Sequence, residues 1–259
     1  MRWAALLTVA LIPWATTPAA VATPDTEIHR VVDAGGQRQW VHCAGTDGPT
    51  ILLISGLGAD HRMWSSVFDR LAQTRRTCIV DRPGLGSSPD RIGRRTVHAG
   101  LQARELRAAL AAVDEPGPFV LVAHSYGGLI ARAFIRQDPA SAAALLLLES
   151  VWPGIEQDFL PSYASPWHEA GTTLDIVAGS RAATGPLPDI PVLVIVAGRP
   201  ENGTSRADTM WRTHQQTAAR EANGQLWTAR RSGHVVQRDQ PDIVVRGVRL
   251  LLKKSTGST

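Results

Sequence analysis

The sequence contains little lysine, and its excess of basic over acidic residues is small. All but two of its 27 basic residues are arginines, and the 23 acidic residues leave a net charge of only +4. The arginines are dispersed along the chain, whereas nucleic-acid-binding domains gather their basic residues on one face or motif. We therefore expect no nucleic acid among the partners of this protein.

Cysteine is also scarce, since Cys43 and Cys78 are the only two in the chain. Two thiols need histidine partners at ligand spacing to build a zinc site, and none of the eight histidines supplies that spacing. His168 and Glu169 begin an H-E-x-x-H pattern, but Thr172 occupies the second histidine position. The sequence therefore predicts no bound metal.

No apolar run is long enough to cross a membrane, because a helix needs about 20 apolar residues to span roughly 30 Å of hydrocarbon. The N-terminal run, residues 3–15, follows Arg2 and precedes small residues that end at Ala22. A cation, a short apolar segment and small residues before a cleavage point are typical of a secretory signal peptide. We expect residues 1–22 to be removed near Ala22 and the mature chain, residues 23–259, to be secreted or periplasmic, without insertion into a membrane.

Export makes the two cysteines informative, because disulfides persist in oxidising compartments. Cys43 and Cys78 each lie in a short strand-like run. Neighbouring strands would bring the two thiols within bridging distance. We expect a disulfide, and the alternative is a pair of buried free thiols.

The pattern of apolar residues predicts one α/β domain. With 44% hydrophobic and 19% charged residues, the 259-residue chain can fill a single core. From residue 51 onward, short apolar runs alternate with longer amphipathic stretches, which is typical of β-α-β units around a parallel sheet. Before them, residues 28–32 and 37–43 predict an antiparallel hairpin at the sheet edge. Further strands are predicted at residues 51–54, 77–81, 119–124, 144–148, 192–197 and 225–229, and helices around residues 106–113 and at residues 127–137 and 241–252.

Residues 151–190 interrupt this alternation. They are rich in proline, glycine, serine and tryptophan, and they are too numerous for an ordinary loop. We expect a small cap, inserted after the sixth strand, over the carboxyl edge of the sheet. Trp152 and Trp167 lie in this segment, and one or both are expected to line an apolar acyl site, whereas Trp64 and Trp211 are interpreted as packing residues.

Ser125 stands between the end of a predicted strand and the start of a predicted helix. Its neighbours two positions away, Ala123 and Gly127, are both small. A serine held on a strained strand-to-helix turn needs small neighbours, and this arrangement is typical of a nucleophile elbow. We expect Ser125 to be the nucleophile, and the adjacent His124 to point to the opposite side of the elbow and to be structural.

Together with three further motifs, this elbow resembles the α/β-hydrolase family over nearly the whole mature chain. The motifs are SGLG at residues 55–58, DRPGLGSS at residues 81–88 and SGH at residues 232–234, in the family's order. The resemblance implies an α/β-hydrolase fold, with a mostly parallel central sheet and helices on both faces, and it implies no cofactor. Asp81 is expected to hold the second motif through Arg82 or through backbone amides.

The resemblance also implies roles for individual residues. In the family, the third residue of the first motif and the residue after the nucleophile give backbone N–H groups to an oxyanion hole, and here these are Leu57 and Tyr126. Ser55 stands where the family usually has a histidine, so the support of this loop is expected to differ. His234 occupies the position of the catalytic base.

Several carboxylates could orient His234. The family's usual position follows the strand at residues 192–197 and offers only Glu201. A second position, used in some haloalkane dehalogenases, follows the preceding strand and offers Glu149. A carboxylate at the end of an all-apolar strand is costly to bury without partners, which favours Glu149. Asp208 is a further candidate.

The sequence therefore predicts an exported serine hydrolase that cleaves a small carboxylic ester or another acyl substrate through an acyl-enzyme. Amidases, lactonases, thioesterases and acyltransferases use the same residues, so these activities are alternatives on one fold. A non-catalytic protein that binds a small ligand on the same fold is the alternative from another class. The oligomeric state is left open.

Overall fold

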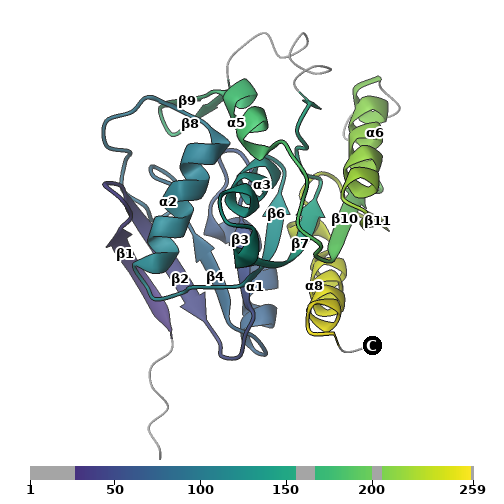
Figure 1. Cartoon of the computed structure of the whole chain (residues 1–259), viewed down its shortest axis with the longest axis horizontal. Coiled ribbons are helices and arrows are strands. Elements are labelled where there is room, and N and C mark those ends of the chain that lie inside the picture. The colour runs from purple at the N-terminus through teal and green to yellow at the C-terminus, as the bar shows by residue number, and fades with distance from the viewer. Residues whose placement is uncertain (1–26, 156–166, 200–205, 258–259) are drawn as a thin grey trace, which may run out of the picture.

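The computed structural model describes residues 27–155, 167–199 and 206–257 (Figure 1). The predicted signal peptide, residues 1–22, lies outside this part of the chain. An eight-stranded sheet with the order β1-β2-β4-β3-β6-β7-β10-β11 runs through the described residues. Its strands are β1 (Ile28–Asp33), β2 (Arg38–Ala44), β3 (Thr50–Ile54), β4 (Thr77–Val80), β6 (Phe119–His124), β7 (Ala142–Leu148), β10 (Val192–Ala197) and β11 (Gln225–Ala229).

The sheet is parallel from β4 to β11, and β2 and β1 extend it as antiparallel strands. The strands lie close to their predicted positions, and the predicted hairpin is present. Every residue of β3, β6 and β10 is buried, which is expected for parallel strands covered on both faces. Cutting a buried leucine of such a strand, for example Leu121, to alanine typically costs about 2–5 kcal/mol.

Helices cover both faces of the sheet. Successive side chains along each strand point to opposite sides, so an all-apolar strand makes both faces apolar. Leu52 and Ile54 pack into one core, and Ile51 and Leu53 pack into the other. The first core is covered by α2 (Ala99–Ala111), α3 (Gly127–Gln137), α5 (Ile176–Ala183) and α6 (Arg206–Glu221), and Figure 1 shows α2 and α3 in front of the sheet. The second is covered by η1 (His61–Trp64), α1 (Ser65–Ala72), α7 (Val236–Asp239) and α8 (Pro241–Ser255). A short turn of 3₁₀ helix, η2 (Pro139–Ser141), precedes β7.

The segment between β7 and β10 contains regular structure that its composition did not reveal. The hairpin of β8 (Trp167–Glu169) and β9 (Thr172–Leu174) joins β5 (Thr96–Val97) in a second, three-stranded sheet with the order β5-β9-β8. The chain then enters α5, whose first turn is capped by Asp175. The segment expected to form the cap, residues 151–190, follows the sixth strand of the main sheet, and its residues 156–166 lie outside the described part.

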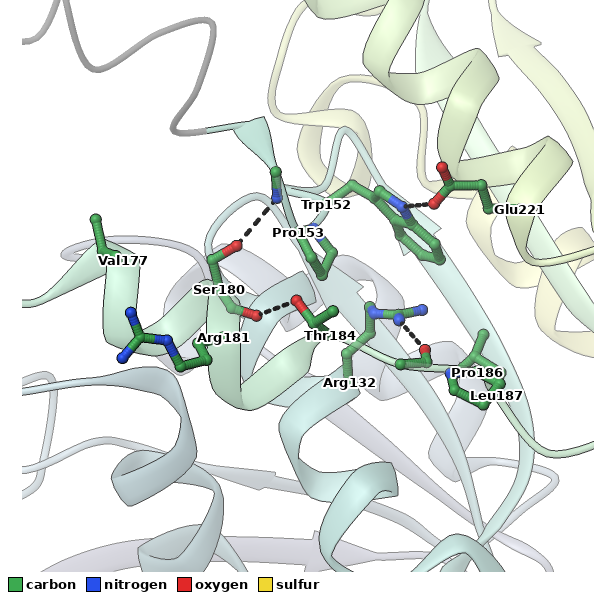
Figure 2. A pocket seen from close by; sticks show the side chains of 12 residues that line it. Arg132, Trp152, Pro153, Val177, Ser180, Arg181, Thr184, Pro186, Leu187 and Glu221 are labelled. Carbon is green, nitrogen blue, oxygen red and sulfur yellow. Dashed lines mark hydrogen bonds between the residues drawn. The ribbon is translucent and has the colours of Figure 1, made fainter.

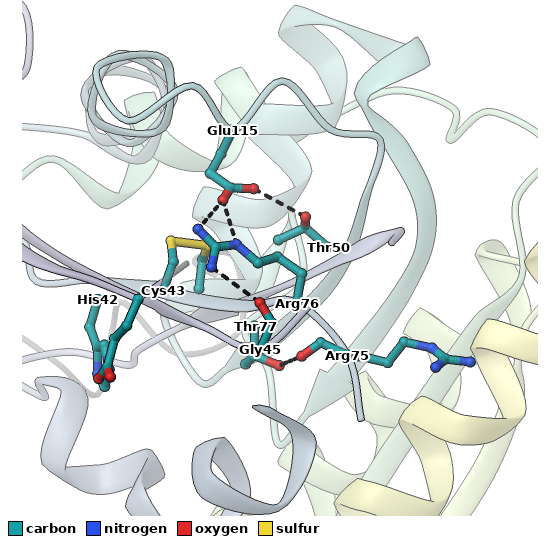
Figure 3. Close-up of a disulfide and its surroundings, with 10 residues drawn as sticks. His42, Cys43, Gly45, Thr50, Arg75, Arg76, Thr77 and Glu115 are labelled. Atoms are coloured by element: carbon teal, nitrogen blue, oxygen red, sulfur yellow. Dashed lines mark hydrogen bonds and ion pairs between the residues drawn. A yellow bond between two sulfur atoms is a disulfide. The ribbon is translucent and has the colours of Figure 1, made fainter. Parts of the chain in front are cut away.

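A disulfide fastens the antiparallel edge to the parallel sheet (Figure 3). Cys43 on β2 and Cys78 on β4 are direct register partners, and both are fully buried. Beside them, Arg76 forms an ion pair of 2.6 Å with Glu115 and donates to the carbonyl of Gly45. The predicted bridge is therefore confirmed, and the alternative of two free thiols is not observed.

None of the helices in the described part of the chain combines the length and the apolar character needed to cross a lipid bilayer.

Candidate active site

Ser125 lies in a sharp turn between β6 and α3. Its φ angle is +53°, in the left-handed region that non-glycine residues rarely adopt. A Cβ atom on Gly127 would lie 2.6 Å from the carbonyl oxygen of Ile54, and one on Gly128 would lie 2.7 Å from that of Val151. The small residues after Ser125 therefore let the backbones of β3 and of the segment after β7 approach the start of α3, which produces the expected elbow.

His234 lies in the loop between β11 and α7, and its ring stands between two oxygen atoms. Nε2 is 3.0 Å from the hydroxyl oxygen of Ser125, and Nδ1 is 3.3 Å from Oε2 of Glu149. The carboxyl ends of parallel strands meet at one edge of a sheet, and this edge is where α/β folds place their sites. Residues that are far apart in the sequence therefore form one chain of polar contacts: serine, histidine, glutamate.

Glu149 follows β7, and its carboxylate has partners besides His234. Oε1 accepts a hydrogen bond of 2.7 Å from the backbone N–H of Ala197 at the end of β10. Oε2 accepts one of 2.7 Å from the indole N–H of Trp211 on α6, whose ring centre lies 5.6 Å from that of His234. The residue is only 3% exposed, so these partners satisfy a carboxylate that would be costly to bury alone.

Glu201 and Asp208 were the other candidates for the carboxylate that orients His234. Glu201 lies outside the described residues. Asp208 lies in the first turn of α6. Among the described residues, the carboxylate that contacts Nδ1 of His234 is that of Glu149. Trp211 was interpreted from the sequence as a packing residue, and its hydrogen bond to Glu149 is a contact that sequence reasoning missed.

His124 contacts His234 from the end of β6, a contact that the sequence did not predict. Its Nε2 lies 2.9 Å from the backbone carbonyl of His234, and the two ring centres are 4.8 Å apart. Because a carbonyl only accepts, His124 must carry its proton on Nε2. Burial, with a smaller contribution from the nearby His234 ring, lowers the pKa of His124 to about 3. His124 is therefore a neutral donor that supports the backbone of His234.

Two backbone amides lie close to Ser125. Within the described residues, neither the N–H of Leu57 nor that of Tyr126 donates a hydrogen bond to another group of the protein. The SGLG loop (residues 55–58) packs on the elbow so tightly that a Cβ atom on Gly56 would lie 3.0 Å from Cβ of Ser125. Two donors without protein partners beside a serine hydroxyl are suited to bind a developing oxyanion.

The family usually has a histidine at the first position of the SGLG loop, and here Ser55 stands there and makes a different contact. The hydroxyl of Ser55 accepts a hydrogen bond of 2.9 Å from the indole N–H of Trp64. Nearby, Asp81 accepts hydrogen bonds from the backbone amides of His61 and Ser87, and from the His61 ring at 2.6 Å. The expectation that Asp81 holds its loop through backbone amides agrees with this geometry. Arg82 does not pair with Asp81, because it is bound to Glu169 of the cap.

A separate hollow of about 740 Å³ lies beside α5, between α3 and the segment that follows β7 (Figure 2). Trp152 lines it, donates to Glu221 at 2.6 Å and stacks under the guanidinium of Arg132 at 3.9 Å. None of the residues that line the hollow is Ser125, His234 or Glu149. Trp152, one of the two tryptophans of which one or both were expected to line an apolar acyl site, forms part of the wall of this hollow. Trp167 is half-buried, and its ring centre lies 6.4 Å from that of Tyr126.

The fold and the motifs of this chain can be compared with those of known families. A model of the family described as "Alpha/beta hydrolase family" matches residues 51–182, just over half of the chain. The chain belongs to the alpha/beta hydrolase family. The resemblance inferred from the motifs is confirmed by this match.

Relatives of this hydrolase include both a protein of similar length and proteins that match over a shorter region. It is 24% identical over 216 residues to YqjL of Bacillus subtilis (strain 168), which covers 78% of this chain and 83% of YqjL. It is 30% identical over 128 residues to a pimeloyl-[acyl-carrier protein] methyl ester esterase of Sodalis glossinidius (strain morsitans). That match covers 46% of this chain and 47% of the esterase, so the hydrolase spans about half of that relative.

A solved structure supports the fold of this hydrolase. The structure of a thermophilic esterase from Thermogutta terrifontis superposes with a TM-score of 0.63 at 20% sequence identity, and it covers 88% of this chain and 98% of that one. At this identity the likeness shows the shared fold.

Proposed function

We propose that this hydrolase cleaves a carboxylic ester through a serine acyl-enzyme. The observation that carries the proposal is the unbroken line of contacts from Ser125 through His234 to Glu149, beside two amides without protein partners. A serine hydroxyl is a weak nucleophile until a base takes its proton, and the resulting imidazolium needs a carboxylate that fixes and stabilises it. The matched region of a methyl ester esterase favours an ester as the substrate.

In the proposed reaction each of these residues has a step. His234 removes the proton of Ser125 at Nε2 as the hydroxyl oxygen attacks the ester carbonyl. The amides of Leu57 and Tyr126 bind the oxyanion of the tetrahedral intermediate. The protonated His234 then gives its proton to the departing alcohol, and the same ring activates a water molecule that hydrolyses the acyl-enzyme. Glu149 holds Nδ1 and stabilises the imidazolium in both halves of the reaction.

We also propose that the protein acts outside the cytoplasm. The disulfide between Cys43 and Cys78 is compatible with an oxidising compartment. The residues at the N-terminus have the composition of a signal peptide. Expression of the full sequence, followed by mass measurement of the protein recovered outside the cytoplasm, tests this: a mass that corresponds to residues 23–259 supports export, and an uncleaved cytoplasmic product contradicts it.

Release of p-nitrophenol from acetate, butyrate and octanoate esters tests the reaction. We expect Ser125→Ala to lower kcat by at least about 10⁴-fold and Glu149→Gln by about 10³–10⁴-fold, as in other serine hydrolases. Glu221→Gln is the matched control, because Glu221 also accepts an indole N–H but lies on the separate hollow. Unchanged turnover in Ser125→Ala contradicts the proposal.

A fluorophosphonate probe distinguishes the enzyme from a non-catalytic binding protein on the same fold. Such a probe labels only an activated serine, so the wild type should be labelled and Ser125→Ala should not. A wild type that is neither labelled nor active on any ester would instead support a role in ligand binding.

A further inference from the structure

A buried ion pair connects the cap to the main domain next to the candidate oxyanion hole. Arg82, which follows β4, binds Glu169 of β8 in a bidentate contact, with Nε 2.8 Å from Oε1 and Nη2 2.5 Å from Oε2. The side chains are only 9% and 3% exposed. Burial alone would raise the pKa of Glu169, but the guanidinium of Arg82, together with hydrogen bonds from Gly58 and Gln102, outweighs it and holds this pKa below its ordinary value. Both groups are therefore charged, and each depends on the other.

The same two side chains bind three backbone groups of the SGLG loop (residues 55–58). Arg82 donates to the carbonyl of Ser55 at 2.8 Å and to that of Gly56 at 2.6 Å. Glu169 accepts the N–H of Gly58 at 2.9 Å. The peptide units on both sides of Leu57 are thus held by charged side chains, whose hydrogen bonds are stronger than those between neutral groups.

These contacts determine where the N–H of Leu57 points. The carbonyl of Gly56 and the N–H of Leu57 belong to one planar peptide unit, and in a trans peptide they point in opposite directions. When Arg82 binds the carbonyl of Gly56, the N–H of Leu57 is directed away from the guanidinium, in a loop that packs on the elbow, where a Cβ atom on Gly56 would lie 3.0 Å from Cβ of Ser125. A rotation of this peptide would break the contact with the guanidinium and remove a donor from the oxyanion hole.

The second amide is connected to the same pair. The hydroxyl of Tyr126, the residue after the nucleophile, donates to the side chain of Gln102 at 2.7 Å. The amide group of Gln102 donates to Oε1 of Glu169 at 3.2 Å. All four side chains are buried. Glu169 is therefore the point where the supports of both candidate oxyanion donors meet, and it belongs to the cap.

We propose that Arg82 and Glu169 are positioning residues for the oxyanion hole, and that the hole has its active geometry only while the cap strand β8 is docked. The inference rests on the proposed function. Neither side chain needs to touch the substrate, because each acts through the backbone of residues 55–58. Since an oxyanion donor acts in the transition state, its misplacement lowers kcat more than it changes KM.

Glu169→Gln is the test variant because it keeps the shape of the side chain. All four hydrogen bonds to Glu169 come from N–H donors, so in either orientation the new NH₂ group faces a donor. Loss of one oxyanion donor costs about 10²–10³ in kcat. For displacement of such a donor we expect about a 10- to 100-fold fall in kcat for p-nitrophenyl butyrate, with KM changed by less than about threefold.

Glu115→Gln is the matched control. Glu115 forms a similarly shielded ion pair with Arg76, with side chains 11% and 13% exposed, beside the disulfide instead of the SGLG loop. It should lower stability, as loss of a buried partner does, and leave kcat unchanged. The double variant Arg82→Gln with Glu169→Gln leaves no unpaired buried charge, and it carries the kinetic test if the single variant does not fold.

Hydrogen–deuterium exchange of a peptide that spans residues 55–58 gives a readout that is independent of activity. We expect faster exchange in Glu169→Gln than in the wild type, and no change in Glu115→Gln. Unchanged kcat together with unchanged exchange in Glu169→Gln overturns the inference. If the wild type hydrolyses no ester, the proposed function fails, and the exchange comparison still decides whether the pair holds the loop.

Discussion

Acidification should destabilise this protein through His124. The residue is 4% exposed, and burial lowers its pKa from 6.5 to about 3. In the unfolded chain it binds a proton near its ordinary pKa, whereas in the folded protein it stays neutral until far lower pH. Protons therefore favour the unfolded state: the stabilisation is complete above about pH 6.5 and is lost as the pH falls toward 3. Because one pKa unit corresponds to about 1.4 kcal/mol, His124 should contribute a loss of about 2 kcal/mol between pH 7 and pH 5.

The assay is urea unfolding followed by tryptophan fluorescence at pH 7, pH 6 and pH 5, for the wild type and for His124→Gln. The glutamine amide can still donate to the carbonyl of His234, but it does not titrate. His42 and His98, whose pKa values are also lowered by burial, are present in both proteins and cancel in the comparison. The wild type should lose about 2 kcal/mol more than the variant over this range. Parallel curves for the two proteins would refute the reasoning.

Three other changes should have distinct outcomes. Replacing Cys43 and Cys78 by alanine opens a loop with a sequence separation of 35 residues, and urea unfolding should show a loss of about 3–4 kcal/mol, whereas an unchanged midpoint would contradict this. Gly127→Ala places a Cβ atom 2.6 Å from a backbone oxygen of β3, so the Tm and the ester turnover should both fall, and a fully active variant would argue against the tight elbow. Trp211→Phe removes a hydrogen bond to the carboxylate of Glu149 and should lower kcat about tenfold, with Trp152→Phe as the control that loses an indole bond to a different glutamate.

Much of the fold could be predicted from the sequence because local patterns determine it. The all-apolar strands, the helical spacing of Leu106 and Leu110, and the small residues around Ser125 are visible in a few consecutive residues. The cap was harder to predict. Strands β8 and β9 have three residues each, too few for an alternating pattern, and they are stabilised by pairing with each other and with the two-residue strand β5.

Site residues that lie in local sequence motifs were predictable, whereas contacts that depend on tertiary packing were not. Ser125 and His234 are marked by their local motifs, and the structure places them in contact. Glu149 was favoured because a carboxylate at the end of a buried strand needs partners, and the structure provides them. Glu169 could be recognised from the sequence only as a fragment of a metal motif, because its partner lies 87 residues away. The role of Trp211 likewise depends on tertiary packing, because α6 packs beside β10 and thereby brings the indole N–H to Glu149.

The disulfide has a consequence for the integrity of the chain. Cys43 and Cys78 enclose residues 44–77, and this covalent ring contains β3, the SGLG loop and α1. A protease that cuts one peptide bond inside the ring leaves both fragments joined, and they separate only under reducing conditions. The segment that packs on the nucleophile elbow is therefore retained in the molecule after a single cleavage.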